Sequence, residues 1–307
     1  MKISQMLRGS EKPFPSLEIV PPLNGIRKDQ LLDTIGRFMD FAPRYINVTC
    51  HRDQFEYRKQ TDGSYTRHLV RSRLSPVAVC AAVMGAYPVE VVPHLICAGV
   101  TEEEIYSQLY DYHFLGIENV MALRGDSLQG ESRFTPTPGG LGHANELVEA
   151  IRRFEGSIGA SFCVGVGGYP EKHFEAANLA DDVARLKAKV DAGADYVITQ
   201  MFFDNAVFYR FVDACRAAGI GVPIVPGLKP LSNKRQLELL PASFSIDIPE
   251  ELTHAVNAAG SEEAVYETGT EWCIDQCKDL LSHGVPAVHF FTMGKSGNIE
   301  KILKTCF

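Results

Sequence analysis

Short apolar runs alternate with amphipathic segments along almost the whole chain. Runs with the length and the Val, Ile and Phe content of buried strands lie at 16–20, 45–49, 89–95, 118–123, 160–166, 195–200, 222–227 and 286–292. Helical periodicity is clearest in three of the intervening segments, at 101–116, 179–194 and 205–219. Eight strands, each followed by a helix or closing the series, predict a (β/α)8 TIM barrel that takes up residues 1–307 as a single domain.

A doubly wound parallel sheet would show nearly the same alternation. The nearest approach to its glycine fingerprint is GVGGYP at 165–170, which lacks the GxGxxG spacing, so the barrel is favoured. Two segments interrupt the pattern: 50–75 is polar and basic, and 127–142 is rich in Gly, Pro and Ser. Both follow the C-terminal end of a predicted strand, where barrel proteins build their sites.

Composition narrows the class of protein. The 307 residues include 30 Lys and Arg against 38 Asp and Glu, a net charge of −8 that argues against nucleic acid or an anionic membrane as the main partner. No apolar run reaches the roughly 18 residues of a membrane span, and the N-terminus lacks a signal-peptide core. None of the eight cysteines forms a CxxC pair, which predicts free thiols and a cytoplasmic location. Cys273 and Cys277, one helical turn apart, leave a metal or redox pair as an alternative to buried thiols.

Polar and ionisable residues collect where the predicted strands end, and in a barrel these ends converge on one face. They are Glu18, Thr49, His94, Arg124, Gly125, Asp126, Tyr169, Gln200, Thr292 and Lys295. Glu18 stands inside the apolar run SLEIVPP, where an unpaired carboxylate costs several kcal/mol, by rough estimate, and tends to take up a proton.

Four of these residues can also be explained by a structural role without any chemistry. Glu18 could be paired with an arginine, Asp126 could be a turn residue, His94 a core histidine and Gln200 an amide bonded to backbone. Two carboxylates at one rim, Glu18 and Asp126, each following an apolar strand, are a stronger sign of catalysis than any one residue. Different surroundings can keep one of them protonated as an acid and the other ionised.

The motifs PSLEIVPP, NVT, PHLICAG, ALRGDS, GYPEKHFEA, KVDAGADYVITQMFFD, PIVPGLKPLSN and VHFFTM, in this order, resemble the methylenetetrahydrofolate reductase family from about residue 14 to 295. The resemblance implies an FAD-containing barrel that reduces 5,10-methylenetetrahydrofolate to 5-methyltetrahydrofolate with NADH or NADPH, in a ping-pong reaction through the reduced flavin. It further suggests a bacterial-type chain that consists of the catalytic barrel only, and a homo-oligomer.

The resemblance also implies roles for single residues. Glu18 would be the general acid, with a pKa raised by an apolar setting away from cations, and Asp126 an anion between flavin and folate. Gln200 would bind the pterin, Gln236 the folate or nicotinamide, and Lys295 the folate glutamate tail. The implied FAD contacts are Thr49, His94, Arg124, Gly125, Asp126, Tyr169, His173, Asp182 and Lys189. Asp182 and Lys189 are seven residues apart and share a helix face.

The chain departs from some family members after the second strand, where it reads CHRDQFEYRKQ, and at Leu240, where some members have an aromatic residue. Two other functions remain open. One is a non-catalytic flavin- or folate-binding subunit of a larger redox complex, for which a strand-end acid has no use. The other is a lyase or aldolase without flavin, which is disfavoured because we expect no lysine at the end of an internal strand in the position of a Schiff base.

Overall fold

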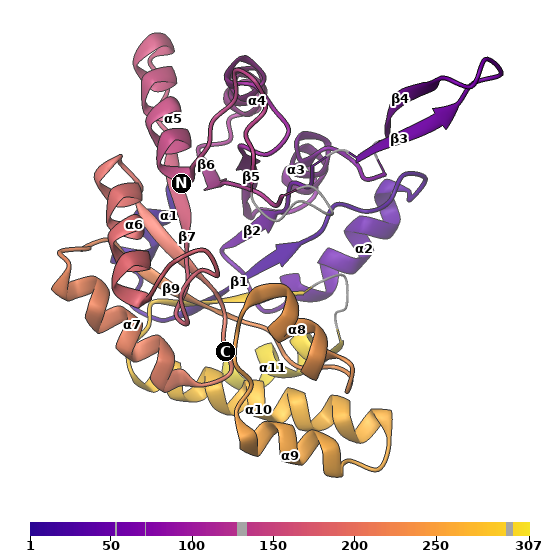
Figure 1. Cartoon of the computed structure of the whole chain (residues 1–307). Coiled ribbons are helices and arrows are strands. Elements are labelled where there is room, and N and C mark those ends of the chain that lie inside the picture. Colours follow the sequence, from indigo (N-terminus) through magenta and orange to yellow (C-terminus); the bar gives the residue numbers. More distant parts are fainter. Residues whose placement is uncertain (53, 71, 128–133, 293–296) are drawn as a thin grey trace.

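Eight parallel strands close into a barrel in a computed structural model that describes residues 1–52, 54–70, 72–127, 134–292 and 297–307 (Figure 1). The strands are β1 (Phe14–Ile19), β2 (Tyr45–Val48), β5 (Glu90–Ile96), β6 (Asn119–Leu123), β7 (Cys163–Gly168), β8 (Tyr196–Met201), β9 (Ile224–Leu228) and β10 (Ala287–Phe291). Each overlaps one of the eight apolar runs, with bounds that differ by up to three residues, and β10 pairs with β1 to close the ring. The predicted (β/α)8 barrel is confirmed, and the doubly wound alternative is wrong.

Helices surround the barrel on its outside (Figure 1). They are α2 (Lys28–Met39), α3 (Pro76–Met84), α4 (Glu102–Phe114), α5 (Ala144–Ile158), α6 (Leu179–Asp191), α7 (Asn205–Ala217), α10 (Glu262–Ser282) and α11 (Gly297–Cys306), with α8 (Gln236–Phe244) and α9 (Glu250–Ala258) added between β9 and α10. The start of α4 has the geometry that its sequence predicts. The Thr101 hydroxyl accepts from the backbone of Glu104, whose carboxylate accepts from the backbone of Thr101.

The barrel interior is filled from its N-terminal end. Helix α1 (Ile3–Gly9) places Ile3 and Met6 against inward-facing side chains such as Tyr45 and Val92. The backbone N–H of Ile3 donates to the Asn119 side chain at 2.9 Å, which fixes the helix to β6. Because this end is packed with apolar side chains, the polar inward-facing residues lie towards the C-terminal end of the strands, as is usual for barrel sites.

The basic segment 50–75 forms an element that the sequence did not predict. Strands β3 (Gln54–Lys59) and β4 (Tyr65–Val70) pair as an antiparallel hairpin that extends away from the barrel (Figure 1). Its turn is closed by Gly63 at a φ of +85° and by Asp62, whose carboxylate accepts from the Ser64 backbone. Tyr57 and Tyr65 are 66% and 62% exposed. The hairpin therefore lies in solvent instead of packing on the barrel.

Cys273 and Cys277 are buried free thiols of α10 in the core between helices and strands. In the described ranges no group of three or more His, Cys, Asp or Glu residues is arranged to hold a metal ion. The burial of both side chains agrees with the buried-thiol interpretation of the pair. Among the helices in those ranges, none has both the length and the apolar content needed to cross a membrane.

Candidate active site

Glu18 lies at the C-terminal mouth of the barrel with three histidines around it. Its side chain is 17% exposed and follows Ser16 on the inward face of β1. The carboxylate atom Oε2 is 3.5 Å from Nε2 of His94 on β5 and 4.0 Å from Nε2 of His289 on β10. The side chain of His51, in the segment after β2, also acts on this carboxyl group. Residues from four parts of the chain thus meet at one carboxylate.

The electrostatic setting of Glu18 differs from the expected one. Burial raises the pKa of Glu18, but its interaction with His289 and the charges of His94, His289 and His51 outweigh burial and leave the pKa below its ordinary value. Burial lowers the pKa of His94 to about 4, so this imidazole is neutral at neutral pH. The expectation that an apolar setting raises the pKa of Glu18 is therefore wrong, because the neighbouring strand β10 and the strand β5 bring histidines to it.

Thr49 and His94, two of the expected FAD contacts, lie beside Glu18. His94 accepts from the Asn47 amide, with 3.3 Å between Nε2 and Nδ2, and the Thr49 hydroxyl lies 3.0 Å from Nε2 of His51. Thr49 and His94 are 7% and 6% exposed. Asp126 is exposed on the rim, and its charge acts on His51. These residues form the inner part of the site.

A second part of the site is a cavity of about 430 Å³ between the ends of β6 and β7 and the helices α5 and α6. Five of the expected FAD contacts line it: Arg124, Tyr169, His173, Asp182 and Lys189. Leu123 and Gly167, at inward-facing positions of β6 and β7, also line it. The cavity therefore reaches from the helices to the barrel mouth.

Lys189 and Asp182 face this cavity together from α6. The Lys189 ammonium donates to the Gly167 carbonyl oxygen at 2.6 Å and lies 5.7 Å from the centroid of the Tyr169 ring. Burial lowers the pKa of Lys189 to about 8, against the opposing charge of Asp182. Burial raises the pKa of Asp182, which is 6% exposed, although Lys189 acts against this. The pair is a half-buried cation beside a buried carboxyl group, and both line the cavity.

Arg124 and its neighbours close the other side of the cavity. Arg124 forms a two-contact ion pair with Glu175, at 2.5 and 3.3 Å. Gly125 has a φ of +82°, and a Cβ atom there would lie 2.7 Å from Cβ of Ala98, so only glycine fits this turn. Burial, with the Arg124 charge, lowers the pKa of His173 to about 4, which makes this imidazole a neutral group at neutral pH.

These residues fit a dinucleotide such as FAD. The cations Arg124, Arg185 and Lys189 line one cavity, where they can bind a diphosphate. The buried Asp182 carboxyl suits a ribose hydroxyl, which would satisfy its hydrogen-bonding capacity.

The residues expected to bind the substrates lie in different surroundings. Gln200 is the second-last residue of β8 and lies on its inward face, and its side-chain oxygen accepts from the Met201 backbone at 2.9 Å. Gln236 accepts from the Ser232 backbone at 2.7 Å and so holds the loop before α8. Leu240 is buried in α8. Lys295 lies outside the described residues.

Lys229 corrects one statement drawn from the sequence. It directly follows β9, is 5% exposed and donates to the Pro230 carbonyl at 3.4 Å. A lysine therefore does follow an internal strand, and the argument against a lyase or aldolase loses this support. The sequence VPIVPGLKP contained this information, because Lys229 stands directly after the apolar run and its last residue Leu228.

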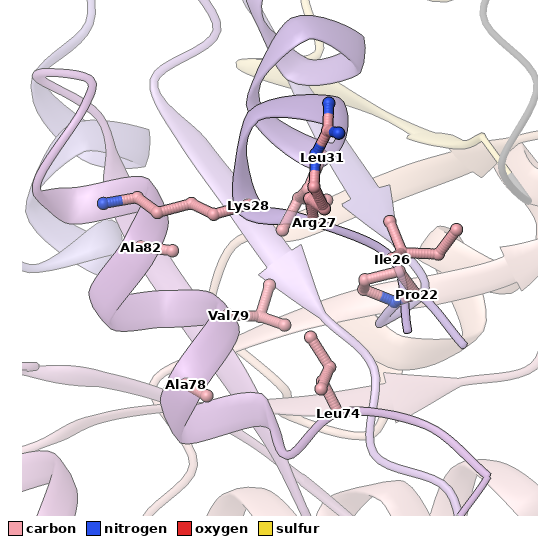
Figure 2. Close-up of a pocket in the computed structure, with 9 residues that line it drawn as sticks. All are labelled: Pro22, Ile26, Arg27, Lys28, Leu31, Leu74, Ala78, Val79 and Ala82. Atoms are coloured by element: carbon pink, nitrogen blue, oxygen red, sulfur yellow. The ribbon is translucent and has the colours of Figure 1, made fainter. Parts of the chain in front are cut away.

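A smaller cavity of about 180 Å³ lies outside the barrel between α2 and α3 (Figure 2). Its lining is mainly apolar, with Pro22, Ile26, Leu31 and Leu74 among its residues. None of the expected site residues lines it. The chemistry of the molecule is thus concentrated at the barrel mouth and the larger cavity.

Comparison with known proteins agrees with this site. The family model described as "Methylenetetrahydrofolate reductase" matches residues 2–306. The chain is 33% identical to "Methylenetetrahydrofolate reductase (NADH) 1" of Arabidopsis thaliana, over 98% of this chain and 48% of that protein. It is 30% identical to "5,10-methylenetetrahydrofolate reductase" of Buchnera aphidicola, over 92% of this chain and 87% of that protein.

The chain thus spans about half the length of the plant relative and nearly all of the bacterial one. A solved structure with a TM-score of 0.64 and 13% identity covers 100% of this chain and 98% of its own. It is described as an uncharacterized protein from Clostridium thermocellum that binds two copies of 5-methyl-5,6,7,8-tetrahydrofolic acid. At this identity the likeness concerns the fold.

Proposed function

Because the chain belongs to the methylenetetrahydrofolate reductase family, we propose that it reduces 5,10-methylenetetrahydrofolate to 5-methyltetrahydrofolate with NADH or NADPH. Two observations carry the proposal: Glu18 lies in the barrel mouth, and the cations of a cavity at the ends of β6 and β7 fit FAD. FAD, when bound, would accept a hydride from the nicotinamide and pass it to the methylene carbon. Both substrates would use the same mouth in turn, which gives ping-pong kinetics.

Glu18 would supply the proton that the folate needs. The five-membered ring of methylenetetrahydrofolate opens when one of its nitrogens is protonated, and a carboxylic acid within hydrogen-bond reach can provide this proton. Glu18 has a lowered pKa among its histidines. A bound pterin would exclude water from the mouth and remove solvation from the carboxylate, which raises the pKa and favours the protonated acid.

Asp126 and Gln200 would position and stabilise the substrate. Ring opening leaves a cation on the folate, and the exposed carboxylate of Asp126 would stabilise it. The Gln200 amide, on the inward face of β8, can pair with the hydrogen-bonding edge of the pterin. Gln236 and Lys295 complete the proposed substrate contacts.

Two groups of residues would hold FAD. Arg124, Tyr169, His173, Asp182 and Lys189 line the outer cavity and would bind the diphosphate and ribose. Thr49, His94, Gly125 and Asp126 lie nearer the mouth and would contact the flavin end of the molecule. We further propose that residues 1–307 act as one catalytic domain and assemble as a homo-oligomer.

Separate measurement of the two half-reactions tests this function. The purified chain should be yellow, its absorbance near 450 nm should bleach with NADH or NADPH under anaerobic conditions, and methylenetetrahydrofolate should restore the colour. Flavin that bleaches but never reoxidises with folate would favour the non-catalytic binding subunit. A colourless chain that takes up no FAD would contradict the proposal and return attention to a flavin-free lyase.

A further inference from the structure

His289 is a histidine inside the barrel that the proposed reaction has not used. It is completely buried and lies next to Ser16 in the parallel pairing of β10 with β1. The Tyr45 ring stacks over its imidazole at a centroid distance of 6.3 Å and an angle of 14°, and the Phe291 ring meets it edge-on at 5.2 Å. Aromatic side chains therefore fix the plane of the imidazole.

The two nitrogens of this imidazole have different surroundings. Nδ1 lies 2.9 Å from the Ser16 hydroxyl oxygen, a hydrogen bond. Nε2 is buried, has no hydrogen-bond partner in the described parts of the chain, and faces Oε2 of Glu18 at 4.0 Å. A buried polar atom without a partner costs about 1–3 kcal/mol, so its aim at a carboxylate needs a reason.

The donors and acceptors around the imidazole explain why Nε2 of His289 faces Glu18. A carboxylate can only accept, so the neutral tautomer with its hydrogen on Nε2 is favoured, and Ser16 stabilises it by donating its hydroxyl hydrogen to Nδ1. His94 is the opposite case, because its Nε2 accepts from Asn47 and presents no hydrogen to Glu18. The two imidazoles flank Glu18 with opposite polarity.

We propose that Ser16 and His289 form a positioning pair in which the N–H of His289 stabilises the carboxylate that Glu18 becomes after it has given its proton to the substrate. The inference rests on the proposed function and deepens it. Without this donor, burial would leave Glu18 a weaker acid that stays protonated to higher pH. With it, the proton transfer is more favourable, because the carboxylate that the transfer leaves is stabilised.

Three variants test the pair. His289→Phe keeps an aromatic ring but removes the donor, and Ser16→Ala removes only the group that fixes the tautomer. His289→Gln keeps an amide N–H that reaches the position of Nε2 and does not titrate. His113→Leu, an exposed histidine in the last turn of α4, is the matched control for loss of a histidine.

The first readout is the pH dependence of the folate half-reaction of the holoenzyme. In His289→Phe its apparent pKa should rise by about one pH unit and the limiting rate should fall about threefold. Ser16→Ala should shift the apparent pKa in the same direction by less, whereas His289→Gln and His113→Leu should match the unmodified chain. Flavin reduction by NADH involves no proton from Glu18 and should be unchanged in all four.

The second readout is the infrared absorption of the Glu18 carboxyl group in the purified chain, assigned by its loss in Glu18→Gln. It reports the Glu18 pKa directly, so it tests the pair even if the chain reduces no folate and the proposed function fails. Besides His289, the titratable groups that act on Glu18 are His94 and His51, and the charge of Asp126 acts on His51. The variants of Ser16 and His289 retain His94, His51 and Asp126. An unshifted carboxyl titration in both His289→Phe and Ser16→Ala would overturn the proposal, as would a His289→Gln shift as large as that of His289→Phe.

Discussion

The ammonium group of Lys189 lies 2.6 Å from the carbonyl oxygen of Gly167, so a helix side chain reaches the strand end where the cavity meets the barrel mouth. Burial holds the pKa of Lys189 near 8. If the charged Lys189 binds the FAD diphosphate, bound FAD raises the pKa of Lys189. FAD binding then weakens at the pH where Lys189 of the FAD-free protein loses its proton. We therefore expect FAD affinity to be constant below about pH 7.5 and to fall by about tenfold per pH unit above pH 8. Fluorescence titration of the apoprotein with FAD at several pH values measures this.

Two variants separate the charge from the shape of the side chain. Lys189→Ala should bind FAD at least about tenfold more weakly at pH 7, since a charge-assisted contact is worth about 1.5–3 kcal/mol. Lys189→Arg should keep FAD bound and lose the decline above pH 8, because an arginine stays charged. Flavin content that survives dilution and heating in Lys189→Ala would rule out the contact.

Glu18→Gln should separate the two half-reactions. The amide is close in shape to the carboxyl group but cannot donate a proton to the folate, so reoxidation of the reduced flavin by methylenetetrahydrofolate should slow by at least about 100-fold. Reduction of the flavin by NADH or NADPH should stay within about twofold, since it requires no acid. Stopped-flow absorbance measures both steps, and an equal loss in each would count against the acid role.

The fold was predictable because each buried strand is a short apolar run that can be recognised in the sequence by itself. All eight barrel strands stand out as apolar runs, since parallel strands covered by helices are apolar on both faces. The hairpin of β3 and β4 was missed because the segment is rich in polar and charged residues, and its residues 56–59 and 65–68 are exposed. Its turn residues Asp62 and Gly63 were the available signal.

The candidate site was predictable in its residues but not in its electrostatics. Arg124, Tyr169 and Lys189 were expected to share a ligand, and they line one cavity. His94 was expected on the same face of the barrel as Glu18, but the approach of His94 and His289 to 3.5 and 4.0 Å from its carboxylate follows only from closure of the barrel. A pKa depends on such distances, so it is the property least accessible from sequence.

Gly125→Ala should destabilise the chain and weaken FAD binding together. The φ of +82° costs an alanine about 1–2 kcal/mol, and the new Cβ atom would lie 2.7 Å from Cβ of Ala98, so the turn between Arg124 and Asp126 must shift. We expect a loss of about 2 kcal/mol or more in the free energy of unfolding. Urea denaturation and flavin content measure the two effects. Gly63→Ala, at a φ of +85° with open space around it, is the matched control for the backbone term alone.

Shortening the hairpin should leave the barrel intact. Glu56 and His68 are cross-strand partners, so an Asn-Gly turn can join them in place of residues 57–67. A two-stranded ribbon in solvent adds little stability of its own, and its removal should move the melting temperature by no more than about 2 °C. Circular dichroism during heating measures this, and flavin content and the KM for folate are followed in the same variant. Loss of FAD would show that the hairpin covers the flavin, whereas a raised KM with normal flavin content would assign its basic residues to the anionic tail of the substrate.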